Sequence, residues 1–365
     1  MKKINVGILF GGKSAEHEVS LQSAINVVAA IDKEKYDVTF IGIDKTGQWH
    51  LNDSSQFLLN SNDPKAIALG NTGKDIVLVP GKERENLLDI TGGRVTGSVD
   101  VVFPVLHGPY GEDGTVQGLL KLANIPFVGA GVLGSAIGMD KDVTKRLLRD
   151  AGIPIAKFTV IHKWDRDRLQ FAEIAQSLGL PLFVKPANAG SSVGVSKVRN
   201  EEQFFAAVDS AFNFDTKVLI EEFVAGREVE CAVLGNEAPQ ASRLGAIIAQ
   251  QEFYSYEAKY IDENGAVLEI PANIPAEVEK EVQAIAVKAF QVLCCEGMAR
   301  VDFFLTADNK PIINEINTIP GFTKISMYPK LWEISGISYP ALIDKLIQLA
   351  LERHGREQHL KTSYV

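Results

Sequence analysis

Several features that mark whole classes of protein are scarce or missing in this sequence. It has three cysteines among 365 residues, at Cys231, Cys294 and Cys295. Their spacing matches neither a metal site nor a redox-active dithiol, so we expect reduced and mostly buried thiols. A disulfide-stapled secreted scaffold is excluded, and a cytoplasmic location is predicted.

Long apolar runs are also missing, and no stretch of about 18 apolar residues is available to span a bilayer. The first residues start with lysines and then turn apolar, as a signal peptide does. However, Asn5 interrupts the apolar run and Gly11-Gly12-Lys13 ends it. This segment is better explained as a first β-strand, and no membrane partner is expected.

Positive charge is in deficit. The chain has 37 Lys and Arg against 46 Asp and Glu, which gives a formal net charge of −9 and a sequence pI near 5.3. This balance argues against a nucleic-acid partner or an anionic membrane surface. An anionic substrate would need a local basic pocket. The length suggests two or three domains at roughly 150 residues each.

The amino-terminal part alternates short apolar strands with helical patterns, which predicts an α/β domain. The expected strands are residues 4–10, 38–43, 101–105 and 126–128, and the expected helices are 19–31 and 116–123. Between Asp44 and Ser98 the sequence is polar and rich in glycine. We expect surface excursions there rather than a domain boundary.

A second unit is expected after a helix over residues 140–150, which Gly152-Ile-Pro154 ends. Strands 182–185 and 193–198 flank a loop of glycine and serine, which predicts an antiparallel flap. The other elements expected are strands 155–161, 218–222, 228–234 and 244–248, helices 201–212, 276–293 and 339–353, and a loop over 253–264.

A β-hairpin is predicted near the carboxyl end, because two strand patterns flank turn chemistry at Asp308-Asn309. With its turn centred there, Asp302 lies opposite Glu315 and Arg300 lies opposite Asn317. All four side chains share one face, since side chains alternate along a strand.

That face predicts a metal site. Two directly opposed carboxylates repel each other unless a cation lies between them, and hard oxygen ligands suit Mg²⁺ bridging to the phosphates of a nucleotide. The alternative is a solvated polar face, and a slip of one residue would remove the site. The other face, with Asn314 as its one polar member, is expected to be core and carries Val301, Phe303, Leu305, Ile312 and Ile316.

Two glycine-rich stretches match nucleotide-binding patterns. Residues 7–14 match the P-loop pattern, but Ile8 to Phe10 belong to a predicted buried strand and Glu16 would lie near the phosphates. Residues 129–134 match the dinucleotide fingerprint, but the acid that should end the next strand is missing. Ordinary strand-to-helix turns are favoured, with a P-loop kinase and a dehydrogenase as the alternatives.

A third pattern combines three signals in order. Lys185 ends an apolar strand and precedes a small, flexible loop over residues 186–194 that can cover phosphates. The strand over 218–222 ends in acids suited to an adenine amino group and ribose hydroxyls. The carboxylate hairpin follows, and together the three predict a nucleotide site.

The stretches that complete this pattern occur in a fixed order along most of the chain. They are Gly11-Gly-Lys-Ser-Ala-Glu16-His-Glu-Val-Ser20, His107-Gly-Pro-Tyr-Gly-Glu-Asp-Gly114, Met139-Asp-Lys141, Lys185 to Gly194, Tyr256-Glu-Ala-Lys259-Tyr260, Arg300-Val-Asp302 and Asn314-Glu-Ile-Asn317-Thr-Ile-Pro-Gly321. In these residues the sequence resembles the ATP-grasp superfamily, and within it the D-alanine–D-alanine ligases.

The resemblance implies three domains. They are an amino-terminal Rossmann-like α/β domain over 1–139, a central α+β flap domain over 140–222, and a carboxyl-terminal α+β domain with an antiparallel sheet over 223–365. It also implies a cytoplasmic homodimer that uses ATP, two Mg²⁺ or Mn²⁺ ions and, in some relatives, a monovalent cation. The implied reaction joins two D-alanines through a D-alanyl phosphate for peptidoglycan precursors.

The resemblance also assigns residues to the nucleotide and the metal. Lys141 and Lys185 are expected at the phosphates. Glu221 and Glu228 are assigned to adenine and ribose, Phe223 and Val224 to the base, and Glu222 and Lys259 are also counted among the ATP-binding residues. The metal ligands are Asp302, Glu315 and Asn317. Relatives often carry a lysine where this chain has Glu222, so that contact differs.

The amino-acid end is implied in the same way. Glu16 would bind the ammonium of the first D-alanine through a network with Ser191 or Ser192 and Tyr260, and His107 would lie nearby. Lys259 and Ser326 would bind the carboxylate of the second D-alanine. Arg300 and a backbone N–H near Gly321 would stabilise the oxyanion, and residues 253–264 would form a lid.

Three alternatives stay open. One is a grasp-like nucleotide-binding regulator without chemistry, which the intact hairpin set argues against. A P-loop kinase is the second. The third is a related ligase with a hydroxy-acid acceptor such as D-lactate, or another carboxylate–amine ligase.

Overall fold

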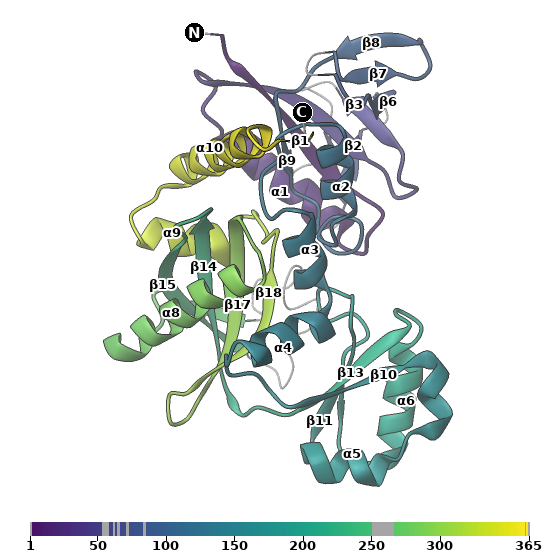
Figure 1. Ribbon diagram of the computed structural model, residues 1–365, viewed down its shortest axis with the longest axis vertical. Coiled ribbons are helices and arrows are strands. Elements are labelled where there is room, and N and C mark those ends of the chain that lie inside the picture. The colour runs from purple at the N-terminus through teal and green to yellow at the C-terminus, as the bar shows by residue number, and fades with distance from the viewer. Residues whose placement is uncertain are drawn as a thin grey trace.

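The structure is a computed structural model that describes residues 2–52, 58–60, 63, 66–70, 73–82, 85–249, 266–361 and 363. Its strands form three main sheets, which succeed one another along the long axis of the molecule (Figure 1). A separate two-stranded ladder pairs β4 (Leu58–Leu59) with β5 (Ala68–Leu69). Helices and sheets alternate as expected for the α/β (α+β) class.

The amino-terminal sheet contains β1, whose Ile8, Leu9 and Phe10 are fully buried. This strand pairs in parallel with both neighbours, and such strands are apolar throughout because helices cover both faces. The order of its seven strands is β8-β7-β6-β3-β2-β1-β9. The bounds are β1 (Ile4–Gly11), β2 (Tyr36–Ile43), β3 (Trp49–Asn52), β6 (Lys74–Leu78), β7 (Leu87–Asp89), β8 (Arg94–Gly97) and β9 (Val101–Pro104).

Two expectations for this unit were wrong. The segment between Asp44 and Ser98 adds four antiparallel strands to the sheet instead of only surface excursions. Residues 126–128 form one bridge, between Val102 and Phe127, rather than a strand. Pro126 has no N–H to extend the ladder, and the chain turns at Gly129, whose φ is +94°.

The helices of this part begin with α1 (His17–Ala30), α2 (Thr115–Leu122) and α3 (Val132–Met139). Next comes α4 (Lys141–Asp150), which begins at the expected place because the side chain of Asp140 accepts hydrogen bonds from the N–H groups of Asp142 and Val143.

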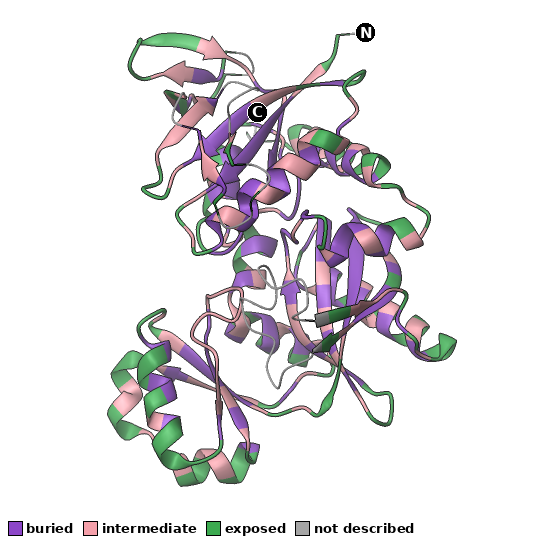
Figure 2. Ribbon diagram, turned by 180° about the vertical axis from the view of Figure 1, so that it is seen from behind, coloured by how far each residue is buried: buried purple, intermediate pink, exposed green. Residues whose placement is uncertain are grey.

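The central unit is an antiparallel sheet of order β10-β13-β11-β12. Its elements are β10 (Phe158–His162), η1 (Lys163–Arg168), α5 (Phe171–Leu178), β11 (Leu182–Pro186), β12 (Ser196–Val198), α6 (Glu201–Ala211) and β13 (Lys217–Glu222). The predicted flap is confirmed, since β11 and β12 pair antiparallel. The unit has its own apolar core, and the outward surfaces of its helices are largely exposed (Figure 2).

The third sheet is antiparallel, with the order β16-β15-β14-β17-β18. Its elements are β14 (Gly226–Gly235), β15 (Gln240–Ala249), β16 (Ala266–Glu269), α8 (Ala276–Val292), β17 (Gly297–Thr306), β18 (Pro311–Asn317) and α9 (Met327–Ile334). Val229, Cys231 and Val233 of β14 pack with α8, whereas Ala232 and Leu234 pack with α9. The two helices therefore cover opposite faces.

The last helix, α10 (Tyr339–Gln358), is longer than predicted and returns to the amino-terminal unit (Figure 1). The Arg353 guanidinium donates to the carbonyls of Gly129 and Phe127 at 2.5 and 2.8 Å. One apolar core runs from β1 through Phe322 and Tyr328 to this helix. The first and third units are thus packed together through a shared core.

Candidate active site

The hairpin β17–β18 has the predicted register where the charged side chains lie. Asp302 pairs with Glu315 and Arg300 pairs with Asn317. Nearer the turn the expectation was wrong, because a register shift follows Asp302 and Phe303 pairs with Ile313. A bulge of this kind places one extra residue on one strand, so Ile313 rather than Ile312 becomes the buried core residue.

Arg300, Asp302, Glu315 and Asn317 of this hairpin line a cavity of about 360 Å³. It brings together most of the predicted catalytic and substrate residues, from segments far apart in the sequence. The predicted residues on its wall are Glu16, His107, Ser191, Glu228, Arg300, Asp302, Glu315, Asn317, Gly321 and Ser326. Further polar side chains to which the sequence analysis gave no role also line it, namely Glu112, Glu230, Asn314, Thr323 and Lys330.

Arg300 is held by acids on two strands. Its guanidinium donates to both oxygens of Asp302 at 2.7 Å, and its Nε lies 2.9 Å from Glu230 Oε2. The side-chain amide of Asn317 also donates to Asp302, at 2.9 Å. Ionised partners make these bonds strong and directional. Alternation along strand 228–234 could have indicated Glu230, which lies directly opposite Asp302 on β14.

The oxygen donors of the hairpin suit a divalent metal ion. Asp302 and Glu315 face each other across neighbouring strands and both line the cavity, and the amide nitrogen of Asn317 points to Asp302. Within the described part of the chain, no three His, Cys, Asp or Glu side chains are arranged so that they could hold a metal ion by themselves. Two carboxylates with an amide oxygen nevertheless suit Mg²⁺ or Mn²⁺, which prefer oxygen ligands.

Glu16 anchors the opposite wall of the cavity. It precedes α1, is 6% exposed and accepts a short hydrogen bond from Ser191 Oγ. A side chain would not fit at Gly190, since a Cβ there would lie 2.8 Å from Glu16 Oε2. Ser191 and Ser192 both have positive φ, +50° and +61°, a conformation that costs energy for residues other than glycine.

Burial changes the protonation of two neighbours of Glu16. The pKa of His107 is lowered to about 4 by burial, and the nearby positive charge of Arg300 adds to this. The pKa of Glu112 is raised to about 8 by burial and by the charge of Glu16. Near neutral pH His107 is therefore largely uncharged.

A second cluster of charge lies on the central unit. The carboxylate of Glu221 contacts two buried lysines, with Lys145 Nζ at 2.8 Å and Lys185 in a short contact. Burial alone would raise the pKa of Glu221, but the two lysines outweigh it and lower the pKa. Lys141 donates to the carbonyl of Ala189 at 2.6 Å, at the base of the flap loop.

Lys145 was missed by the sequence analysis, although its position could have indicated it. It follows Lys141 by four residues in a predicted helix, so the two ammonium groups share a face. Burial lowers the pKa of both lysines, and the charge of Glu221 opposes this. Lys185 was expected at phosphates, and in the structure it pairs with Glu221, the residue expected at adenine.

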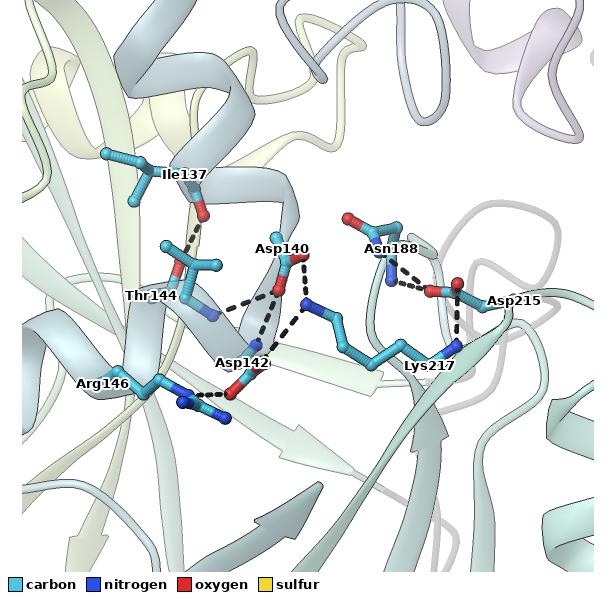
Figure 3. A network of polar contacts seen from close by, with 9 residues as sticks. Ile137, Asp140, Asp142, Thr144, Arg146, Asn188, Asp215 and Lys217 are labelled. Atoms are coloured by element: carbon cyan, nitrogen blue, oxygen red, sulfur yellow. Dashed lines mark hydrogen bonds and ion pairs between the residues drawn. The ribbon is translucent and has the colours of Figure 1, made fainter. Parts of the chain in front are cut away.

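A polar network fixes the amino end of α4 next to the flap loop (Figure 3). Lys217 Nζ lies 2.5 Å from Asp140 and 3.3 Å from Asp142. Asp215 accepts hydrogen bonds from the backbone N–H and the side-chain amide of Asn188 at 2.8 and 2.9 Å. The backbone N–H of Lys141 donates to the carbonyl of Ala187. The network therefore connects the expected phosphate-binding lysine, the flap loop and β13.

Comparisons with known proteins agree with this arrangement. Two family models match, the D-ala D-ala ligase N-terminus over residues 5–130 and the D-ala D-ala ligase C-terminus over residues 147–348. The chain belongs to the D-alanine–D-alanine ligase family.

Relatives of high identity extend over the whole chain. A D-alanine–D-alanine ligase of Oceanobacillus iheyensis is 59% identical over 363 residues, covering 100% of this chain and 99% of the relative. The D-alanine–D-alanine ligase A of Escherichia coli K12 is also 59% identical, with 100% of both chains covered.

Solved structures of similar proteins have the same fold. The D-alanine-D-alanine ligase of Coxiella burnetii has a TM-score of 0.84 at 40% identity, covering 98% of this chain and 97% of that one. The VanG D-Ala:D-Ser ligase of Enterococcus faecalis has a TM-score of 0.84 at 39% identity, covering 96% and 100%. The ATP-grasp fold predicted for this chain is thereby confirmed.

Membership of this family excludes the P-loop kinase and the dehydrogenase, the alternatives drawn from the two glycine motifs. The P-loop interpretation is wrong, because β1 runs as a buried strand to Gly11 and leaves no phosphate-wrapping turn. Lys13 beyond it is exposed. In the second motif, Gly131 is the N-cap residue of α3, and the residues before it form an isolated bridge instead of the strand that the dinucleotide fingerprint requires.

The remaining predicted nucleotide residues lie beyond the end of β13. Phe223 is 42% exposed, and Lys197 Nζ lies 4.6 Å from its ring centre, so a flat apolar surface is available there. The carboxylate of Glu222 accepts a hydrogen bond from the backbone N–H of Lys157 at 2.8 Å. Val224 is half-buried beside them.

Some predicted parts lie outside the described residues. These are Lys259, Tyr260 and the lid expected over 253–264. Among the helices that the structure describes, none is long and apolar enough to cross a membrane.

Proposed function

We propose that this chain joins two D-alanines to D-alanyl-D-alanine, with ATP as the activating substrate. The observation that carries the proposal is one cavity in which Glu16 and Ser191 face Arg300, Asp302 and Glu315. An ammonium-binding acid and a carboxylate-lined phosphate end thus lie within one space. That is the arrangement needed to activate one amino acid and present it to another.

The first step is attack by the carboxylate of the first D-alanine on the γ-phosphate of ATP, which yields D-alanyl phosphate and ADP. Glu16 would hold the ammonium of that D-alanine. Lys141 and Lys185 would hold phosphate oxygens, so Lys185 would leave Glu221 when the nucleotide binds. Divalent ions at Asp302, Glu315 and Asn317 would neutralise phosphate charge when bound. Positioning does most of the work in such transfers.

The second step is attack by the amine of the second D-alanine on the activated carbonyl, after which phosphate leaves. Arg300 and the Gly321 N–H would stabilise the oxyanion of the tetrahedral intermediate. Ser326, with Lys259 of the proposed lid, would bind the carboxylate of the second D-alanine. A closed lid would keep water from the acyl phosphate, and Tyr260 would join the network of Glu16 and Ser191.

Glu221 and Glu228 would contact adenine and ribose, with Phe223 and Val224 against the base. The domain boundaries proposed are 1–139, 140–222 and 223–365, and the last two units would close on the nucleotide. A cytoplasmic homodimer that makes peptidoglycan precursors is also proposed. The described structure records Cys231, Cys294 and Cys295 as free thiols, which supports a reducing compartment.

The nearest rival is a ligase with a different acceptor, because one structural relative is a D-Ala:D-Ser ligase. The test is ADP release with ATP, Mg²⁺ and D-alanine, L-alanine, D-lactate or D-serine. We expect release to require a D-amino acid and D-alanine alone to give full turnover. Turnover that D-alanine cannot support would reject the proposal.

A further inference from the structure

The loop that follows β18 carries Gly321 along the wall of the cavity, and it is held from outside its own unit. Two side chains of the amino-terminal unit bind the peptide groups of Ile319. The Ile319 N–H donates to Glu112 Oε1 at 3.1 Å, and the Ile319 carbonyl lies 3.1 Å from His107 Nδ1.

A third side chain holds the loop on the other side of Gly321. The N–H of Phe322 donates to Ser23 Oγ, on α1, at 3.2 Å. Ile319 is 2% exposed and both Phe322 and Ser23 are fully buried. A buried N–H group without an acceptor is destabilising, so these contacts determine where the loop lies.

The three side chains form one connected set, in which His107 has a single workable protonation state. A carbonyl oxygen only accepts, so Nδ1 must carry the proton toward Ile319. Nε2 is then an acceptor, and Ser23 Oγ lies 3.3 Å from it and can donate. The second oxygen of Glu112 accepts the Gly108 N–H at 2.7 Å. Both ring nitrogens of His107 are thus occupied.

We infer that Ser23, His107 and Glu112 are positioning residues, which hold residues 319–322 so that the Gly321 N–H lies beside Arg300. The inference rests on the proposed function. It assigns His107 to the loop rather than to the substrate. It also makes the amide-forming step depend on contacts between the amino-terminal and carboxyl-terminal units, because a donor displaced from its position stabilises an oxyanion poorly.

Ser23→Ala tests the inference, since it removes the acceptor of the Phe322 N–H without touching the cavity wall. The matched control is Ser242→Ala. Ser242 is also fully buried and its Oγ accepts a backbone N–H, from Ala232 at 3.0 Å, within the third sheet. Both variants should lower Tm by a similar amount.

The two variants should differ in catalysis. For Ser23→Ala we expect kcat for dipeptide formation to fall on the order of 10- to 100-fold, with the KM for ATP changed less than about twofold. The first step can be followed alone by positional isotope exchange in ¹⁸O-labelled ATP with D-alanine, and it should be largely retained. Ser242→Ala should keep both rates.

Glu112→Gln supplies an independent arm. Its amide oxygen can still accept from Ile319, but its NH₂ group then faces the Gly108 N–H, so we expect the same selective loss of the second step. The inference is overturned if both Ser23→Ala and Glu112→Gln turn over normally, or if exchange and dipeptide formation fall together. A wild-type protein that forms no D-alanyl-D-alanine would instead reject the proposed function.

Discussion

Two clusters of buried charge in this protein carry opposite signs. The cavity at the hairpin is lined by six carboxyl groups and two cationic side chains, Arg300 and Lys330. The cluster between α4 and the central sheet has three lysines, Lys141, Lys145 and Lys185, around Glu221. An acidic site suits an ammonium group and divalent ions, whereas a basic site suits phosphates. Under the proposed function, the acidic cavity would hold the first D-alanine and the divalent ions, and the basic cluster would hold phosphates of the nucleotide.

The largest expected effect removes the acidic end. Asp302→Asn or Glu315→Gln should lower ligase turnover by orders of magnitude, because the metal would lose a charged ligand. Both variants should still melt cooperatively, since the other face of the hairpin supplies its core contacts. Asp308→Asn in the exposed hairpin turn is the control and should turn over normally. Near-normal turnover in either hairpin variant would disprove the metal assignment.

The next largest effect removes charge from the basic end. Lys185→Ala should weaken ATP binding by about tenfold or more, since a direct charged contact to phosphate is lost. Lys13→Ala should change it little, because Lys13 lies beyond a buried strand in the discarded P-loop motif. Calorimetry with a non-hydrolysable ATP analogue measures both. The opposite ranking would contradict the assignment of Lys185 to the phosphates.

A smaller effect is expected when the network beside the basic cluster is disrupted while Lys141, Lys145 and Lys185 are kept. Lys217→Met leaves Asp140 and Asp142 without their shared cation, which should shift Lys141 and raise the KM for ATP several-fold. Lys217→Arg keeps a cation at this position, so its KM for ATP should stay much closer to the wild-type value. Arg166→Met breaks a more exposed pair with Asp209 in the same unit and is the control. An unchanged KM for Lys217→Met would show that the network does not position Lys141.

The smallest expected effect concerns stability at acid pH. Burial lowers the pKa of His107 to about 4 from its usual value of 6.5, so the unfolded chain binds the proton more readily than the folded chain. The stability that His107 contributes is present above pH 6.5 and is lost as the pH falls toward 4. It should decrease by about 2 kcal/mol between pH 7 and pH 5.

Thermal melts at pH 7 and pH 5 measure this contribution. His107→Asn should show a smaller loss of Tm on acidification than the wild-type protein. The control is His359→Asn, at an exposed position near the end of α10, which should behave as wild type. An equal pH response in all three proteins would show that the pKa of His107 does not differ between the folded and unfolded states.

Local rules predicted the acidic end well and the basic end less well. Alternation and turn chemistry were sufficient to place Asp302 opposite Glu315, because both depend on neighbouring residues. The bulge at Asn314 was missed, since it is set by packing against the rest of the sheet. At the basic end, Lys185 and Glu221 were identified separately, but their pairing depends on how β11 and β13 lie side by side.

Contacts between distant segments were beyond the sequence patterns. Glu112 and Ser23 reach Ile319 and Phe322 only because α10 and the shared core hold the first and third units together. Nothing in the spacing of Glu112 or Ser23 indicates those partners. Likewise, the added strands β3, β6, β7 and β8 lack strong alternation. Their conformation is decided by pairing with neighbouring strands, from β3 on β2 outward to β8 on β7.

The most direct test of the account is a competition between acceptors at pH 8. With D-alanine as donor, D-alanine and D-lactate are supplied as acceptors at matched concentration, and the products are identified by mass spectrometry. The amine must lose its proton before it attacks, so dipeptide formation should rise with pH, and an acidic cavity disfavours a second anion that lacks an ammonium. The account predicts D-alanyl-D-alanine as the sole major product. An equal or greater yield of D-alanyl-D-lactate would contradict it.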